Sequence, residues 1–158
     1  IYSKMDCVDN MQISVSQRKG SSSTMFASRS GEIRDRAEHL LEFVGLYSKR
    51  SLISGDLSFG QQKLLEFAMA LMNDPKVLLL DEPTAGINPT LINGLIDRLR
   101  RANEELGITL CVIEHNMRVI MNLASNIYCL SNGKMLASGK PEDLQNDPRV
   151  IDAYLGGH

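Results

Sequence analysis

The chain alternates between segments whose apolar residues recur at helical spacing and short segments that are apolar almost throughout. Helical spacing is present over residues 32–44, 61–73, 90–106 and 116–124. The short apolar runs predict strands at residues 77–80, 108–113 and 127–130. Asn132 and Gly133 form a strong hairpin signal, so residues 134–137 are expected to return antiparallel.

From residue 77 onward the predicted order is strand, helix, strand, helix, strand and hairpin. This order predicts an α/β fold with a mostly parallel sheet flanked by helices and an antiparallel edge. No polar residue interrupts residues 77–80, so this strand is expected to be buried on both faces. Two domains are expected: a helical subdomain over residues 1–75 and the α/β part over residues 76–158.

The region before the first strong helix is less regular. Residues 5–15 are weakly amphipathic, which fits either a short helix or an irregular strand. Residues 14–31 are rich in serine and poor in apolar residues, which predicts a mobile loop. Residues 32–44 then form the first long helix, and Ser58 is a plausible N-cap for the helix over residues 61–73.

Composition excludes several classes of function. The net charge of -2 gives no reason to expect nucleic-acid binding driven by a basic surface, and the absence of Trp argues against platforms on which bases stack. No apolar run approaches the ~20 residues that span a bilayer, and no signal peptide is expected. The first residue is not Met, which suggests a fragment. Cys111 and Cys129 lie in apolar runs and are expected to be core residues in a reducing compartment.

Two acidic residues, Asp81 and Glu82, directly follow the apolar run at residues 77–80. Pro83 cannot donate to a strand ladder, so the strand is expected to end there. The carboxyl ends of strands are where open α/β sheets bind ligands. An apolar run followed by two acids is the Walker B arrangement, in which the first acid holds Mg²⁺ and the second can act as general base. Taken alone, the same pattern also fits a solvated turn.

Two further stretches accompany this pair: Leu-Ser-Phe-Gly-Gln at residues 57–61 and Glu-His ending at His115. Together with the acids, they resemble the ATP-binding cassette (ABC) family, in its order of signature, Walker B with D-loop, and switch histidine. Phe59 replaces a residue that is usually Gly in the signature. Asn88 closes the D-loop stretch at residues 85–88, where Asp is more usual. The resemblance implies a partial P-loop NTPase domain with ATP and Mg²⁺ as cofactors.

The resemblance also implies residue roles. Asp81 would order Mg²⁺, Glu82 would polarise the attacking water, and His115 would contact the γ-phosphate. In this family two cassettes pair head to tail, and the signature of one completes the nucleotide site of the other. The residues that this implies for nucleotide binding are Ser58, Phe59, Gly60, Gln61 and Asn88. Independently of the family, the backbone amides at the start of a helix suit a phosphate.

The printed sequence lacks a phosphate-binding loop ending in Gly-Lys-Ser/Thr. Gly133-Lys134 is followed by Met135, and Gly139-Lys140 by a proline, so neither pair qualifies. By resemblance, the chain corresponds to roughly the C-terminal two-thirds of a family domain. The whole protein is expected to be an ABC-type ATP hydrolase, whereas this chain alone is expected to be inactive.

Within the family the chain most resembles the ATP-binding subunits of branched-chain amino-acid importers, through residues 40–46, 85–89 and 146–156. That likeness implies a subunit that couples ATP hydrolysis to solute import. The implied partners are a second ATPase subunit, transmembrane permease subunits and, indirectly, a periplasmic solute-binding protein; nucleic acid is not among them. The implied location is peripheral, at the cytoplasmic face of the membrane.

Two alternatives from other classes stay open. One is the C-terminal lobe of a chromosome-maintenance or repair ABC ATPase, although no heptads precede residues 57–61. The other is a non-catalytic interaction module, which the missing phosphate-binding loop favours.

Overall fold

The computed structural model describes residues 1–15 and 25–154, and the side chains of residues 25–29 are outside that description. The chain separates into two compact units, residues 1–112 and 113–158. The subdomain boundary expected between residues 75 and 76 stays a prediction.

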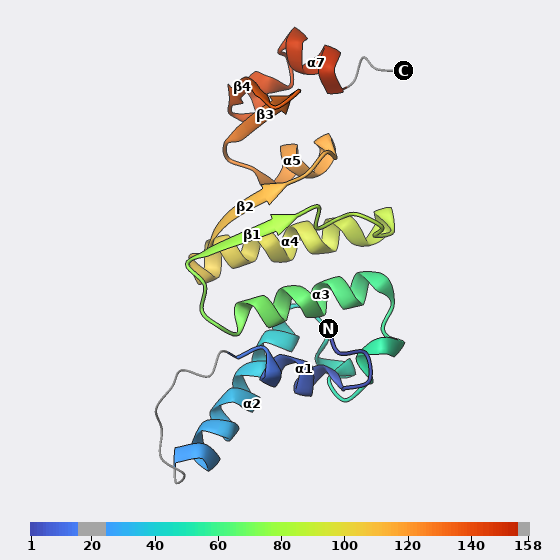
Figure 1. Ribbon diagram of the computed structural model, residues 1–158, viewed down its shortest axis with the longest axis vertical. Helices are drawn as coiled ribbons and strands as arrows, with labels where there is room; N and C mark the ends of the chain where they lie inside the picture. Colours follow the sequence, from blue (N-terminus) through green and yellow to red (C-terminus); the bar gives the residue numbers. More distant parts are fainter. Residues whose placement is uncertain (16–24, 155–158) are drawn as a thin grey trace. The chain divides into compact units, whose positions relative to one another are not determined.

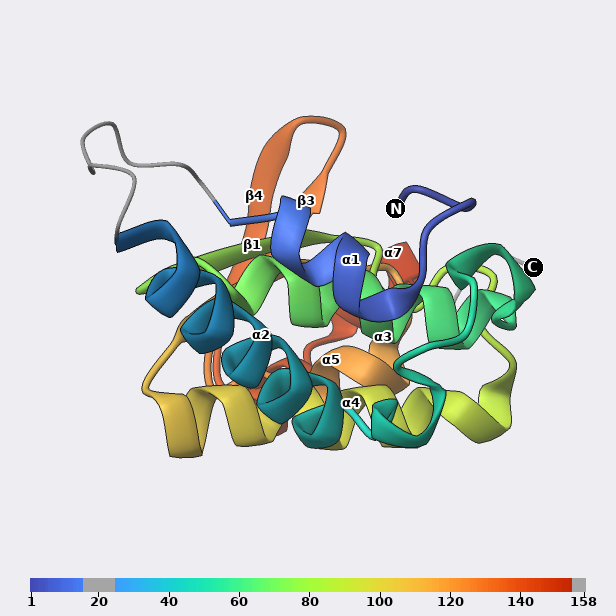
Figure 2. The same cartoon turned by 90° about the horizontal axis from the view of Figure 1, so that it is seen from below.

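The first unit contains three helices that pack against one another: α1 (Cys7–Ile13), α2 (Met25–Phe43) and α3 (Phe59–Leu71) (Figures 1 and 2). Residues 5–15 therefore contain a helix, one of the two structures expected. The α2 helix begins seven positions before residue 32, so residues 25–31 are helical and the loop expected there is wrong. A single Gly and no Pro occur in that stretch, so nothing in it breaks a helix. Residues 16–24 of the expected loop lie outside the described residues.

A buried polar network anchors the first residues of the chain. Asn10 has no exposed surface, and its Nδ2 donates to the carbonyl oxygens of Asp6 (2.8 Å) and Tyr2 (3.1 Å). Its Oδ1 accepts from the Tyr2 N–H at 2.7 Å, and its Nδ2 also donates to Ser54 Oγ at 3.2 Å. Ser54 is equally buried and donates to the Tyr2 carbonyl at 2.9 Å. The network thus ties the N-terminal segment to η2 (Ser54–Asp56), the short 3₁₀ helix just before α3.

Two arginines donate hydrogen bonds to carbonyls at the C-terminal ends of α3 and α2. The Arg36 guanidinium on α2 donates to the carbonyls of Leu71 (2.9 Å) and Met72 (3.2 Å) at the end of α3. Arg98 on α4 (Pro89–Leu106) donates to the Val44 carbonyl at 2.6 Å, just beyond the end of α2. A guanidinium near the last carbonyls of a helix satisfies acceptors that the helix leaves free. A second short 3₁₀ helix, η1 (Tyr47–Lys49), follows that end.

The α/β part of this unit is a strand pair joined by a helix. In Figure 1, β1 (Val77–Asp81) and β2 (Thr109–Ile113) run in the same direction, and α4 lies along them. Parallel neighbours require such a crossover. The expected helix stop at Gly107 is confirmed, because that residue is left-handed with φ 67° and follows the last residue of α4.

The prediction that β1 is buried on both faces is wrong for the described chain. Val77 is 55% exposed and Leu79 is 74% exposed, whereas the alternate residues Leu78 and Leu80 are half-buried. Successive side chains of a strand point to opposite faces, and no described element covers the outer one. Cys111 on β2 is exposed as well, contrary to expectation, while Cys129 is buried as expected.

The second unit is a hairpin packed against short helices: α5 (Met117–Leu123), β3 (Ile127–Ser131), β4 (Lys134–Gly139), α6 (Pro141–Leu144) and α7 (Pro148–Tyr154). The hairpin is confirmed, since β3 and β4 pair antiparallel. Asn132 and Gly133 have φ angles of 50° and 73°, as a type I′ turn requires. The core of this unit contains Ile127, Cys129, Ala137, Leu144 and Val150.

The strands differ from expectation in one respect. Among the described strands, β1–β2 and β3–β4 form two separate pairs rather than one sheet with an antiparallel edge. Local patterns specify where strands and turns occur, whereas pairing depends on contacts between distant segments. None of the helices that the structure describes combines the length and the apolarity of a membrane span.

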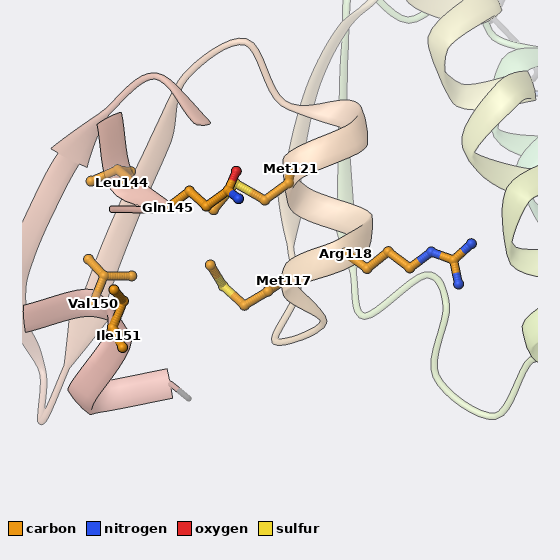
Figure 3. Close-up of a pocket in the computed structure, with 7 residues that line it drawn as sticks. All are labelled: Met117, Arg118, Met121, Leu144, Gln145, Val150 and Ile151. Carbon is orange, nitrogen blue, oxygen red and sulfur yellow. The ribbon is translucent and has the colours of Figure 1, made fainter. Parts of the chain in front are cut away.

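A mostly apolar hollow of about 240 Å³ lies within the second unit, between α5 and the α6–α7 segment (Figure 3). Figure 3 shows Arg118 pointing away from the other side chains that line it. The remaining lining residues are Met117, Met121, Leu144, Gln145, Val150 and Ile151. None of the candidate site residues lines this hollow, so it plays no part in the site described below.

Candidate functional site

The signature stretch forms the start of α3. Ser58 is its N-cap, as predicted: the Ser58 Oγ accepts from the Gln61 N–H at 3.4 Å, and the Ser58 N–H donates to Gln61 Oε1 at 3.0 Å. This reciprocal capping box fixes the entry into the helix. Ser58 and Phe59 are exposed, whereas Gly60 is buried. The first turn of α3, with its amides lacking intrahelical acceptors, therefore lies at the surface.

A second residue, Gln62, also holds this loop, and no sequence pattern indicates it. Gln62 Nε2 donates to the carbonyls of Ser54 and Leu57, both at 3.3 Å. Through Ser54, the loop before the signature is also connected to the buried Asn10 side chain. A glutamine in a helix carries no sequence signal for such a role, because its partners lie outside the helix.

The two acids lie where the sequence placed them, at the carboxyl end of β1. Asp81 is the last residue of the strand, Glu82 follows it, and both are exposed. Glu82 is left-handed with φ 44°, and its carbonyl accepts from the Ala85 N–H at 3.0 Å in the turn that follows. Residues other than Gly are uncommon in this conformation, and such positions cluster at functional sites. Of the candidate residues, only Asp81 borders a hollow of about 180 Å³ between α3, β1 and α4.

The structure brings the signature and the D-loop stretch together. A Cβ on Gly86, which has φ 71°, would lie 3.0 Å from Cε1 of Phe59, so the aromatic ring lies directly against this glycine. Asn88 caps α4, because its Oδ1 accepts from the Thr90 N–H at 3.0 Å. An amide oxygen performs this capping role as well as the more usual carboxylate.

His115 lies two residues beyond the end of β2 and is exposed. Its neighbour Asn116 caps α5 by accepting from the Arg118 N–H at 3.1 Å. His115 belongs to the second unit, so its role toward a nucleotide stays a prediction.

The donor set at the end of β1 fits Mg²⁺ rather than a protein-enclosed metal. Within the described residues, no group of three or more His, Cys, Asp or Glu side chains could hold a metal ion. Mg²⁺ keeps several waters and is held by one or two carboxylates together with substrate phosphates. Asp81 and Glu82 are exposed oxygen donors suited to such partial coordination. Burial raises the pKa of the Cys7 and Cys129 thiols, which disfavours the reactive thiolate form.

Solved structures with this arrangement are ATP-binding cassettes. The chain superposes with a TM-score of 0.79 and 26% identity on the ADP conformation of an ATP-binding cassette of an ABC transporter, covering 99% of this chain and 65% of that one. It also matches the dimeric post-hydrolysis state of a cassette bound to ADP and Pi, with a TM-score of 0.70 and 26% identity over 88% and 58% of the two chains. The fold is thus that of an ABC ATPase domain.

Sequence comparison agrees. The family model "ABC transporter" matches residues 3–85, more than half of the chain, and the chain belongs to this family. The model "Branched-chain amino acid ATP-binding cassette transporter" matches residues 134–158.

Individual relatives give the same result. A probable branched-chain amino acid transport ATP-binding protein LivG of Archaeoglobus fulgidus is 36% identical over 97% of this chain and 61% of its own length. The high-affinity branched-chain amino acid transport ATP-binding protein BraF of Pseudomonas aeruginosa is 38% identical over 79% and 49%. The chain therefore spans less than two thirds of the length of these relatives.

Proposed function

We propose that this chain belongs to the ATP-hydrolysing subunit of an ABC importer, and that the importer takes up branched-chain amino acids. The names of the relatives support the substrate class, as does the family model on residues 134–158. In the structure, part of that segment contributes to a core: Leu144 and Val150 are buried with Ile127 and Cys129. The match of this transporter model to residues 134–158 disfavours a chromosome-maintenance lobe.

The observation that carries the proposal is the exposed start of α3 beside the turn that follows β1. Ser58 and the first-turn amides form a half-site for a phosphate, and the adjoining turn leads back to Asp81 and Glu82. In this proposal Ser58, Phe59, Gly60, Gln61 and Asn88 face the nucleotide of a second cassette.

The acids take complementary roles. Bound Mg²⁺ would neutralise phosphate charge, and Asp81 would help to hold it. The Glu82 carboxylate would accept a proton from the attacking water as general base. His115 would contact the terminal phosphate. Glu82 is exposed at a turn, so a water molecule can reach its carboxylate.

The partners in this proposal are a second cassette paired head to tail, transmembrane permease subunits and, through them, a periplasmic solute-binding protein. The related cassette bound to ADP and Pi is dimeric, which supports the first of these. The location in this proposal is the cytoplasmic face of the membrane.

We expect the 158-residue chain by itself not to hydrolyse ATP, because its sequence has no Gly-Lys-Ser/Thr loop to hold the phosphates. Phosphate release measured with malachite green should equal the protein-free background. Turnover that disappears in a Glu82→Gln variant would contradict this expectation.

The head-to-tail arrangement is tested in the whole protein by Ser58→Arg. A bulky cation at the start of α3 should block closure of the dimer and leave ATP binding to the single subunit intact. Gel filtration with and without MgATP measures the dimer, and fluorescent-nucleotide titration measures binding. Ser48→Arg is the matched control, because Ser48 is also an exposed serine of the first unit but lies in η1, away from the signature. If both variants dimerise alike, the proposed pairing is wrong.

A further inference from the structure

The start of α3 and the turn after β1 contact each other through two glycines. On one side, Gly86 faces the Phe59 ring, with 3.0 Å between Cε1 and the position that a Cβ would take. On the other side, Gly60 faces α4: a Cβ there would lie 3.0 Å from Leu91 Cδ1 and 3.7 Å from Ile87 Cγ2. The start of α3 thus contributes Gly60 and the Phe59 ring, and the segment after β1 contributes Gly86 and the side chains of Ile87 and Leu91. The apolar side chains of each segment lie against the glycine of the other.

Close packing at these two glycines leaves little room for a side chain. Contacts near 3.0 Å to an added carbon leave no room for a methyl group unless a neighbour moves. Both glycines are close in sequence to candidate site residues: Gly60 follows Phe59 within the signature, and Gly86 lies between Glu82 and Asn88. Ile87 is also held locally, since its N–H donates to the Thr84 carbonyl at 3.1 Å.

We propose that Phe59 and Leu91 are positioning residues that lock the signature and the D-loop turn into a single rigid element within one chain. In this role Phe59 acts through its contact with Gly86. A displacement of the turn after the acids of β1 is then passed on to Ser58 through the contact between Gly86 and Phe59, the residue next to Ser58. The effect of this lock on catalysis rests on the proposed function, whereas the packing contact itself does not.

The geometry also accounts for the aromatic residue at position 59, where the family usually has Gly. A glycine there would remove the ring that lies against Gly86, and the turn would keep its own hydrogen bonds and the contact of Ile87 with Gly60. The Phe59 ring fills that space, and the Lys63 ammonium lies 5.6 Å from the ring centroid. A cation near an aromatic face favours one ring position.

The first test compares two glycines that have similar positive φ angles. Gly86 and Gly107 have φ angles of 71° and 67°, but a Cβ on Gly107 would meet nothing within 4 Å. Both Ala variants carry the strain of a similar positive φ, so a lock predicts that Gly86→Ala lowers the unfolding midpoint by about 2–4 °C more than Gly107→Ala. In a Phe59→Ala background this difference should vanish.

Gly60 offers a second, independent pair. Gly60 and Gly31 are both helical, and Gly31 has nothing within 4 Å of its added Cβ. Gly31→Ala should raise the unfolding midpoint through helix propensity, whereas Gly60→Ala should not. When Leu91→Ala is also present, Gly60→Ala should become stabilising.

Positioning is distinguished from simple stability by native-state amide exchange. Gly86→Ala should speed exchange at Gln61 and Gln62, in the first turn of α3, by about tenfold, with exchange in the β3–β4 hairpin unchanged. Gly107→Ala should leave all of these amides unchanged. If Gly86→Ala does not fold, Phe59→Ala serves instead, and the Ile87 amide should be the one that exchanges faster.

Equal midpoints for the two left-handed glycine variants, or unaltered exchange in the first turn of α3, would overturn the lock. No nucleotide is present in these measurements. A failure here therefore leaves the ATPase proposal standing, and a failure of the ATPase proposal leaves the lock standing.

Discussion

In the whole protein, Glu82→Gln is expected to lower ATP turnover by a factor of about 10²–10⁴. Gln keeps the shape of the side chain and still hydrogen-bonds to water, but it cannot accept a proton from it. Nucleotide binding should survive, so the variant should accumulate as an ATP-bound dimer in gel filtration with MgATP. Steady-state phosphate release and bound-nucleotide content are the two measurements.

Two comparison variants sharpen this expectation. Glu104→Gln removes a different exposed carboxylate, which lies on α4, and should leave turnover unchanged. Asp81→Asn should weaken Mg²⁺-dependent nucleotide binding as well as turnover, because a neutral amide is a poorer ligand for a hard cation. If Glu82→Gln retains wild-type turnover, the assignment of Glu82 as general base is wrong.

Asn10→Ala is expected to lower the free energy of unfolding by about 2–4 kcal/mol. The fully buried Asn10 side chain satisfies the Tyr2 N–H and donates to backbone carbonyls and to Ser54 Oγ. Alanine removes these bonds together and leaves a cavity in their place. Urea unfolding followed by circular dichroism measures the change.

Asn146→Ala is the matched control for this prediction. Asn146 is exposed and donates one bond, to the Glu142 carbonyl at 3.1 Å. Its loss should change the free energy of unfolding by no more than about 0.5 kcal/mol. Equal losses in the two variants would mean that the Asn10 network contributes no more than a surface hydrogen bond.

Asn10→Asp gives the same network a pH dependence. A carboxylate would face the carbonyl oxygens of Tyr2 and Asp6 without water, so its pKa in the folded state should lie above the ordinary value near 3.9. The destabilisation should therefore be largest at neutral pH and diminish as the pH falls toward the unfolded pKa. Urea midpoints at pH 7 and pH 4.5, each relative to wild type, measure this difference.

The sequence predicted those features that depend on neighbours along the chain. The Ser58 cap, the stop of α4 at Gly107 and the turn at Asn132 each follow from the chemistry of one or two residues. Likewise, the acids after β1 were located by a local pattern. The start of α2 was missed because a weakly apolar segment without Pro gives no periodic signal.

Features that depend on distant contacts could not be predicted. Asn10 meets Ser54 across 44 positions, and Arg98 meets the Val44 carbonyl across 54 positions. Whether the outer face of β1 is covered is likewise decided by other segments. The contact between Phe59 and Gly86 is of the same kind: the sequence shows a substituted signature, but only the fold shows what the ring touches.

The left-handed backbone at Glu82 has a consequence for engineering. Holding a residue other than Gly at φ 44° costs about 1–2 kcal/mol, which Gly would largely avoid. Screening a library of variants for heat resistance alone would therefore favour Gly at position 82. The most heat-resistant variants would then lack the proposed general base. Engineering of thermostable variants should therefore keep Glu82 unchanged.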